Sequence, residues 1–269
     1  MTLYLDEQVQ NYLSWLKDVK HSPYQTFRAY QVDLTQFLKY FLRIDKNELP
    51  GKEDMEEYIG YIKNKFNYAS YRRKVTVLRN FTRYLVQSGI TVPDPFVSIS
   101  LPMPDINFNM QATYSDVLQL IESLPESDFT ELRDKLIFCL IAKCGLTIKQ
   151  LLSLKIKDIN LAAGQIIFSK DQMTFMDNKT IEIAGKYIAS LPESPSLDDY
   201  LISNHQKNKL PLSPRTIHLI IDNISKKTNS KQRLSPTILR RLFAKSLTER
   251  NVNKETKELI LGKKCRLVG

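Results

Sequence analysis

The sequence has few cysteines, histidines and glycines, and it has no long apolar run. Its 269 residues include three cysteines, three histidines and eight glycines. Cys139, Cys144 and Cys265 lack paired ligand spacing and indicate reduced thiols, and the three histidines are too few to favour a Cys/His zinc site. We expect no metal and no cofactor. No apolar run reaches the ~18 residues of a membrane span, and the N-terminus, MTLYLDEQVQ, does not resemble a signal peptide. We therefore expect a cytoplasmic protein without a membrane segment.

Positive charge is abundant and unevenly placed. The chain carries 39 Lys and Arg against 29 Asp and Glu, a net charge of +10. Residues 1–105 have a net charge of only +2, whereas residues 206–269 have +12. Such a concentration favours a polyanionic partner. The alternative is a lysine-rich segment that serves only solubility.

Helical spacing dominates the first hundred residues. Residues 22–42 repeat apolar side chains at intervals of three and four, with Ser22 as a candidate cap before Pro23. Similar patterns predict helices over about 6–19, from residue 53 onwards, and over about 69–88. The fold class expected is mainly α.

The predicted helix over 69–88 is strongly basic. Its buried stripe is predicted to consist of Val75, Leu78, Phe81, Leu85 and Val86. Its basic residues are Arg72, Arg73, Lys74, Arg79 and Arg83, and it has no acidic residue. An ordinary solvated helix face would have acidic residues four positions away, so their absence favours contact with phosphate.

Four prolines between Pro93 and Pro104 indicate a restricted, extended linker. We assign residues 1–100 to a first domain, 101–111 to the linker and 112–269 to a second domain. The second domain has a predicted antiparallel β-hairpin, with strands over 164–168 and 179–183. The rest of that domain is predicted to be largely helical, including 214–224, 236–250 and 254–261.

The order of these elements resembles the tyrosine recombinase, or phage integrase, family, most nearly its Xer type. In the first domain the matching residues are Ser22-Pro23, Thr26, Arg28-Ala29-Tyr30, Asp33-Leu34 and Phe37-Leu38. In the second they are Gly145-Leu146, Leu151 to Leu154, Asp158-Ile159, Leu239-Arg240, Phe243-Ala244 and Leu261-Gly262. The resemblance implies an N-terminal four-helix SAM-like core-binding domain and a C-terminal mixed α/β domain of the recombinase catalytic type.

The resemblance also implies a set of catalytic positions, and most are changed here. In the family a tyrosine attacks the DNA phosphate, two arginines stabilise the charge on its oxygens, and a lysine and histidines move protons. Lys170 and Arg240 remain as vestigial members of this set. Thr147 replaces the first arginine, Thr237 replaces a histidine, Arg241 follows Arg240 at another histidine position, and Lys263 replaces a third. No tyrosine follows Tyr200.

We therefore expect a DNA-binding pseudoenzyme that is impaired in strand cleavage and serves as an accessory or regulatory factor in DNA recombination or integration. Its expected partners are double-stranded DNA and an active recombinase relative, and it is expected to be a monomer or weak oligomer. The expected DNA contacts are Arg72, Arg73, Lys74, Arg79, Arg83, Lys170, Arg240, Arg241 and Lys245. Two alternatives are an active recombinase completed by a partner or by a missing C-terminal tyrosine, and a protein-interaction module that has lost DNA binding.

Overall fold

The computed structural model describes residues 4–90, 112–191, 194–204, 209–227 and 233–262. The chain divides into two compact units, Met1–Asn107 and Phe108–Gly269. The proposed linker, 101–111, lies outside the described residues, as do Lys263 and Cys265. None of the helices within the described ranges is long and apolar enough to cross a membrane.

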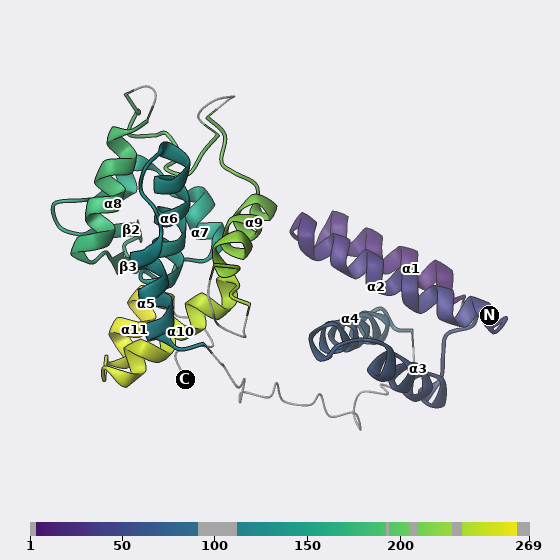
Figure 1. Cartoon of the computed structure of the whole chain (residues 1–269). Helices are drawn as coiled ribbons and strands as arrows, with labels where there is room; N and C mark the ends of the chain where they lie inside the picture. Colours follow the sequence, from purple (N-terminus) through teal and green to yellow (C-terminus); the bar gives the residue numbers. More distant parts are fainter. Residues whose placement is uncertain (1–3, 91–111, 192–193, 205–208, 228–232, 263–269) are drawn as a thin grey trace. The chain divides into compact units, whose positions relative to one another are not determined.

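The N-terminal unit is helical, and its first two helices lie side by side (Figure 1). A short π-helix, η1 (Trp15–Val19), extends the first of them. The four α-helices are α1 (Leu5–Ser14), α2 (Tyr24–Arg43), α3 (Lys52–Lys65) and α4 (Tyr68–Gln87). Their inward faces form one core that includes Leu5, Phe37, Tyr58, Ile62 and Leu78.

The predicted helices of this unit are confirmed, with two local corrections. Helix α2 buries Leu34, Phe37 and Phe41 at the expected helical spacing. However, the cap position is Pro23, so the assignment of Ser22 as the cap is wrong. Val86 was predicted to be buried and is instead 51% exposed, although the neighbouring Leu85 is buried in the core.

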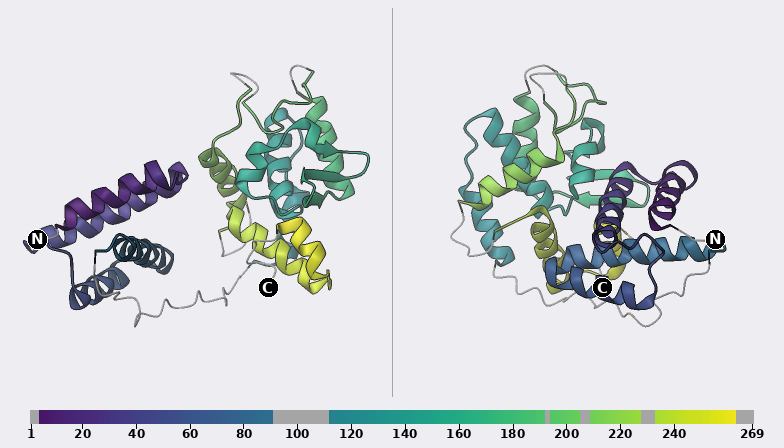
Figure 2. Two further views of the ribbon diagram at one scale, coloured as in Figure 1. Left: turned by 180° about the vertical axis from the view of Figure 1, so that it is seen from behind. Right: turned by 90° about the vertical axis from the view of Figure 1, so that its right-hand side faces the viewer.

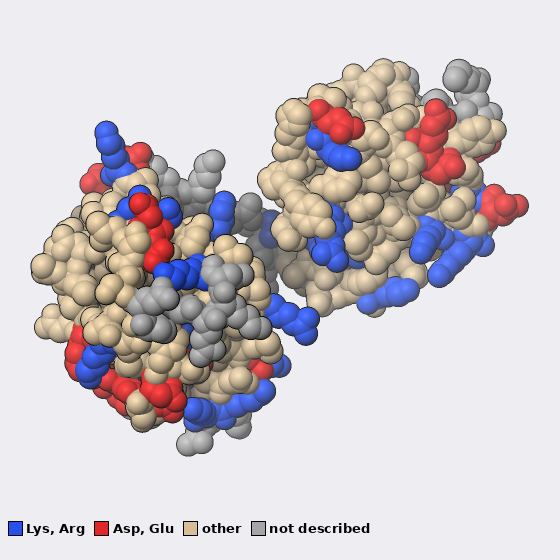
Figure 3. All heavy atoms as spheres, turned by 90° about the horizontal axis from the view of Figure 1, so that it is seen from above, with Lys and Arg blue, Asp and Glu red and all other residues tan. Residues whose placement is uncertain are grey.

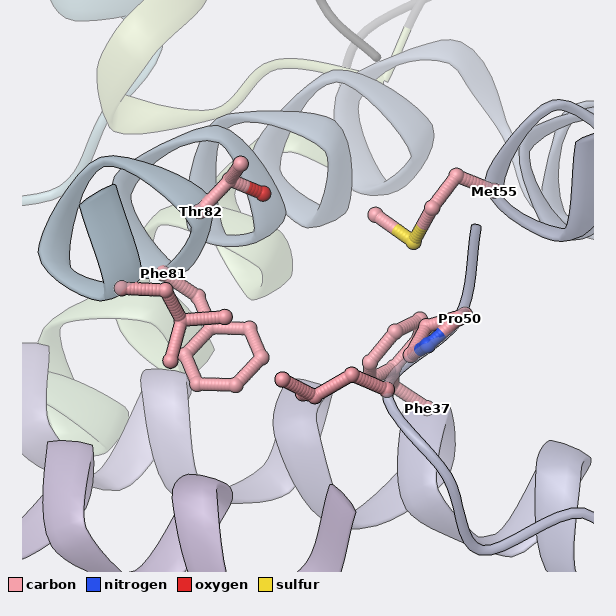
Figure 4. A pocket seen from close by; sticks show the side chains of 7 residues that line it. Phe37, Pro50, Met55, Phe81 and Thr82 are labelled. Atoms are coloured by element: carbon pink, nitrogen blue, oxygen red, sulfur yellow. The ribbon is translucent and has the colours of Figure 1, made fainter. Parts of the chain in front are cut away.

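A small apolar hollow lies in the N-terminal core (Figure 4). Phe37, Pro50, Met55, Phe81 and Thr82 line it, together with two leucines. It encloses about 10 Å³, about the space of a single water molecule. The hollow is therefore a packing defect of the core and offers no room for a ligand.

The C-terminal unit is built around one buried helix, α6 (Phe129–Ala142), whose residues from Leu136 to Ala142 are all completely buried. Helices on several sides contact it (Figure 2). The surrounding helices are α5 (Tyr114–Ser123), α7 (Ile148–Ser153), α8 (Asn178–Ala189), α9 (Pro214–Ser225) and α10 (Pro236–Glu249). A final helix, α11 (Lys254–Leu261), packs against α10 and the sheet.

The sheet has three short antiparallel strands in the order β1-β2-β3. A 3₁₀ turn, η3 (Ile156–Asp158), leads into β1 (Ile159–Asn160), followed by β2 (Gln165–Ser169) and β3 (Gln172–Phe175). Ile166 pairs with Thr174, and both side chains face the core. The first predicted strand is confirmed, but it pairs with β3 rather than with residues 179–183.

The predicted second strand, 179–183, is wrong, because these residues form the start of α8. The alternation of Thr180, Ile181, Glu182 and Ile183 resembled a strand. Asp177 instead caps a helix, accepting a hydrogen bond from the Thr180 backbone N–H at 2.9 Å. Thr180, Ile183, Ala184 and Tyr187 are then buried at helical spacing.

Many charges of the C-terminal unit are paired within the unit. Glu126 accepts hydrogen bonds or ion pairs from Lys186, Lys135 and Lys179. Hydrogen bonds from Lys186 and Lys135 lower the pKa of the Glu126 carboxyl to about 2. Basic and acidic side chains accordingly lie beside one another on the left-hand body in the space-filling view (Figure 3).

Candidate functional site

The basic helix α4 is well defined locally. Asn67 caps it by accepting a hydrogen bond from the Ser70 backbone N–H at 3.0 Å. Its inward face buries Tyr71, Val75 and Leu78 against the other helices of the unit. This packing fixes which residues face outward.

Three arginines form a stripe along the outward face of α4. With 3.6 residues per turn, Arg72, Arg79 and Arg83 project within about 40° of one another. Arg83 is exposed and the other two are half-buried. Arg72 and Arg83 are eleven positions apart, which makes the stripe about 16 Å long at 1.5 Å per residue. We call Arg72, Arg79 and Arg83 the α4 stripe, and no acidic residue interrupts it.

Arg73 and Lys74 do not belong to this stripe, and the expectation of an unpaired basic face is wrong for them. Asp33 of α2 accepts a hydrogen bond from Arg73 at 2.9 Å and one from Lys74 at 2.8 Å. The Lys74 side chain is only 4% exposed, so it cannot reach a partner outside the protein. Its acidic partner is on another helix rather than one turn away.

In the C-terminal unit, Thr147 and Gln150 cap helix α7 reciprocally. The Thr147 hydroxyl accepts from the Gln150 backbone N–H at 3.2 Å, and the Gln150 side chain accepts from the Thr147 backbone N–H at 2.9 Å. The Thr147 hydroxyl also donates to the same Gln150 oxygen at 2.8 Å. These two side chains are therefore engaged in ending the preceding turn and starting α7.

Arg240 of α10 binds two backbone carbonyls. Its Nε donates to the Gly145 oxygen and one terminal nitrogen donates to the Leu261 oxygen, both at 2.7 Å. The half-buried guanidinium thus connects α10 to the turn after α6 and to the end of α11. Gly145 has a φ of +70°, and a Cβ there would lie 2.7 Å from the Phe243 ring. Only glycine fits this position without rearrangement.

Two sequence matches decide the identity of the chain. Residues 9–89 match the phage integrase N-terminal SAM-like domain, and residues 111–264 match the phage integrase family. The chain belongs to the phage integrase family. A tyrosine recombinase of Pseudothermotoga lettingae is 27% identical, with 96% of this chain and 90% of the relative covered. A tyrosine recombinase XerC of Lactobacillus delbrueckii subsp. bulgaricus is 26% identical over the same shares.

Solved structures share the fold. The Tn1549 transposon integrase in complex with circular intermediate DNA has a TM-score of 0.75 at 15% identity, covering 98% of this chain and 93% of that one. XerH recombinase bound to palindromic difH substrate has a TM-score of 0.71 at 17% identity, covering 94% and 78%. The expected family and fold class, including the SAM-like and catalytic-type domains, are thereby confirmed.

The phage integrase positions that we predicted to be functional lie on several elements of the C-terminal unit. Arg240 and Thr147 both lie next to the turn that contains Gly145. Thr237 is exposed in the first turn of α10, and Lys170 is exposed in the turn between β2 and β3. Lys263 lies outside the described residues.

The other predicted contacts lie on α10. Arg241 is half-buried, and Lys245 is exposed and pairs with Glu249 at 3.7 Å. Tyr187 is completely buried, and its hydroxyl donates to the Leu201 carbonyl at 3.1 Å. Burial raises the pKa of the Tyr187 hydroxyl. It is therefore unsuited to act as a nucleophile.

Sequence reasoning missed a basic hollow between α9 and the start of α10. Its volume is about 300 Å³, and Arg215, His218 and Arg233 are among its lining residues. Asp222 also lines it and pairs with Arg233 and Lys226. The high charge of residues 206–269 was the available signal, but charge alone did not reveal which side chains converge. The described residues contain no cluster of His, Cys, Asp and Glu that could hold a metal.

Proposed function

We propose that this phage integrase family member binds double-stranded DNA and is impaired in strand cleavage, serving as an accessory or regulatory factor in DNA recombination or integration. The α4 stripe is the observation that supports DNA binding best. Arginine suits this role because its planar guanidinium binds two phosphate oxygens at once and stays charged. Solved relatives of the same fold are complexes with DNA.

The impairment rests on internal positions of the C-terminal unit. A threonine that caps α7 occupies the position of the family's first arginine, and Thr237 occupies that of a histidine. Arg240 is retained, yet it donates at least two hydrogen bonds to backbone carbonyls. Losing one donor to a developing oxyanion typically costs about 10²–10³ in rate. Two substituted positions and an engaged arginine together favour a binding role over cleavage.

A salt titration tests the binding. Affinity of the full chain for a fluorescent 40-base-pair duplex is measured between 50 and 300 mM KCl. We expect log affinity to fall linearly with log salt, with a slope of about −3 or steeper, because each phosphate contact contributes about −0.9. Undetectable or salt-independent binding would overturn the proposal and favour a protein-interaction module.

A nicked suicide duplex tests the cleavage. It is built on the sequence that the protein selects from a random pool at two salt concentrations, and an active family member on its own site serves as the positive control. We expect no covalent protein–DNA adduct on a denaturing gel, with or without that active relative present. An adduct would overturn the impairment while leaving DNA binding intact.

A further inference from the structure

A buried carboxylate joins α2 to α4 beside the α4 stripe. The Asp33 side chain is 2% exposed, and its Oδ1 accepts from both Arg73 and Lys74. Its Oδ2 is buried without a hydrogen-bond partner among the described residues. A buried carboxylate is costly unless it is paired, so the two cations account for its presence here.

The two cations are used differently. Lys74 is buried, donates to Gln36 as well as to Asp33, and lies 4.5 Å from the centre of the Phe66 ring. Its ammonium group is therefore surrounded by protein. Arg73, in contrast, keeps half of its side chain exposed.

The charges of this group leave a surplus at the surface. Asp33 carries one negative charge, and Lys74 already balances it inside the protein. The group of Asp33, Arg73 and Lys74 therefore has a net charge of +1, and Arg73 is its exposed member. Among the described residues, its other N–H groups have no hydrogen-bond partner, and an arginine has five N–H donors in all.

We propose, on the basis of the proposed DNA binding, that Asp33 is a positioning residue that holds the Arg73 guanidinium at the edge of the α4 stripe for contact with a DNA phosphate. Arg73 follows Arg72 directly and lies about 100° around the helix from it. One hydrogen bond to Asp33 holds the guanidinium, while half of the Arg73 side chain stays exposed. Ordering the side chain before binding raises DNA affinity by about fivefold.

The alternative is that Asp33 merely holds α2 and α4 together. A double-mutant cycle separates the two roles, because only a positioning role acts through Arg73. The first change is the paired substitution Asp33→Asn with Lys74→Met, which keeps the net charge and removes the buried ions. Replacing buried ions by neutral groups of similar size is often tolerated. The second change is Arg73→Gln.

The full chain and its variants are compared by affinity for the 40-base-pair duplex at 100 mM KCl. We expect the paired substitution to weaken binding about fivefold when Arg73 is present and not at all when it is Gln. Arg73→Gln alone should also make the salt slope shallower by about 0.9. An equal loss in both backgrounds would overturn the proposal, since that result indicates a structural role.

A second variant leaves the buried group untouched, in case the paired substitution prevents folding. Arg73→Lys keeps the charge and loses the planar fork that Asp33 orients. We expect a loss of about fivefold in affinity with an unchanged salt slope, and wild-type affinity would overturn the proposal. If the wild-type chain itself fails to bind the duplex, the proposed function fails; if it binds but the cycle is additive, only this inference does.

Discussion

Arginines in the two units are engaged differently. In the N-terminal unit the α4 stripe lies on an outward helix face with no acidic residue in its helix. In the C-terminal unit Arg240 donates to two backbone carbonyls inside the unit. Lysines elsewhere in the same unit are also paired, as in the group around Glu126. A count of basic residues alone would give the C-terminal unit the larger share of DNA binding.

The difference shows that the number of basic residues in a unit does not tell how many of them can contact an external partner. The guanidinium of Arg240 satisfies carbonyls at a turn and a helix end, where unpaired backbone groups are costly. In the α4 stripe, by contrast, Arg83 is exposed on the helix face away from the core, while Arg72 and Arg79 are half-buried. We therefore expect the N-terminal unit to contribute most of the proposed DNA affinity, although residues 206–269 carry the greater net charge.

Neutralising the α4 stripe should have the largest effect. We expect Arg72→Gln, Arg79→Gln and Arg83→Gln together to lower affinity for the duplex on the order of 100-fold and to make the salt slope shallower by about 2.7. The control changes Lys17, Lys52 and Lys63 of the same unit to Gln, which removes the same charge elsewhere. Equal losses in the two triple variants would show that only net charge matters.

Arg240→Met should destabilise the C-terminal unit more than it affects DNA binding. Two charge-assisted hydrogen bonds are lost and two carbonyls are left without their donor, so we expect about 3 kcal/mol less stability. Denaturant unfolding followed by circular dichroism measures this. Lys245→Met on the same helix is the control and should change stability by under about 0.5 kcal/mol. If Arg240→Met is as stable as the wild type but binds DNA much more weakly, Arg240 contacts DNA rather than holding the C-terminal unit together.

Thr147→Ala should cost about 1 kcal/mol of stability, because α7 loses its capping side chain. Thr147→Ser retains the hydroxyl and should unfold close to the wild type. The test is the thermal unfolding temperature of the wild type and of the alanine and serine variants. If the alanine and serine variants unfold alike, the side chain does not have the capping role that we give it.

Glu126 should contribute a small acid-sensitive part of the stability. Because its pKa is lowered from 4.5 to about 2 in the folded protein, its contribution is complete above pH 4.5 and is lost as the pH falls toward 2. Solvent screening limits it to about 1 kcal/mol. Glu126→Gln should therefore reduce stability at pH 7 and converge with the wild type near pH 2. The exposed Glu255→Gln is the control, and a constant difference across pH would contradict the assignment.

Local patterns predicted the helices well and long-range pairing poorly. The Ser235-Pro236 start of α10 and the apolar spacing of α2 are visible within a few residues. The partner of Lys74 lies 41 residues away on α2, so a search at four residues could not find it. Arg240 bonds to backbone oxygens, which every residue has, and these leave no trace in the sequence. The strand prediction for residues 179–183 was wrong because polar and apolar residues can also alternate over the first turn of an amphipathic helix.

Gly145 limits how this turn can change by mutation. Its left-handed backbone disfavours any side chain, and the Phe243 ring and Leu261 occupy the space where a Cβ would lie. A smaller residue at position 243 would relieve the crowding and leave the backbone strain in place. In a genetic selection, a defect caused by Gly145→Ala should therefore revert mainly to glycine at this codon rather than through a second-site change in α10.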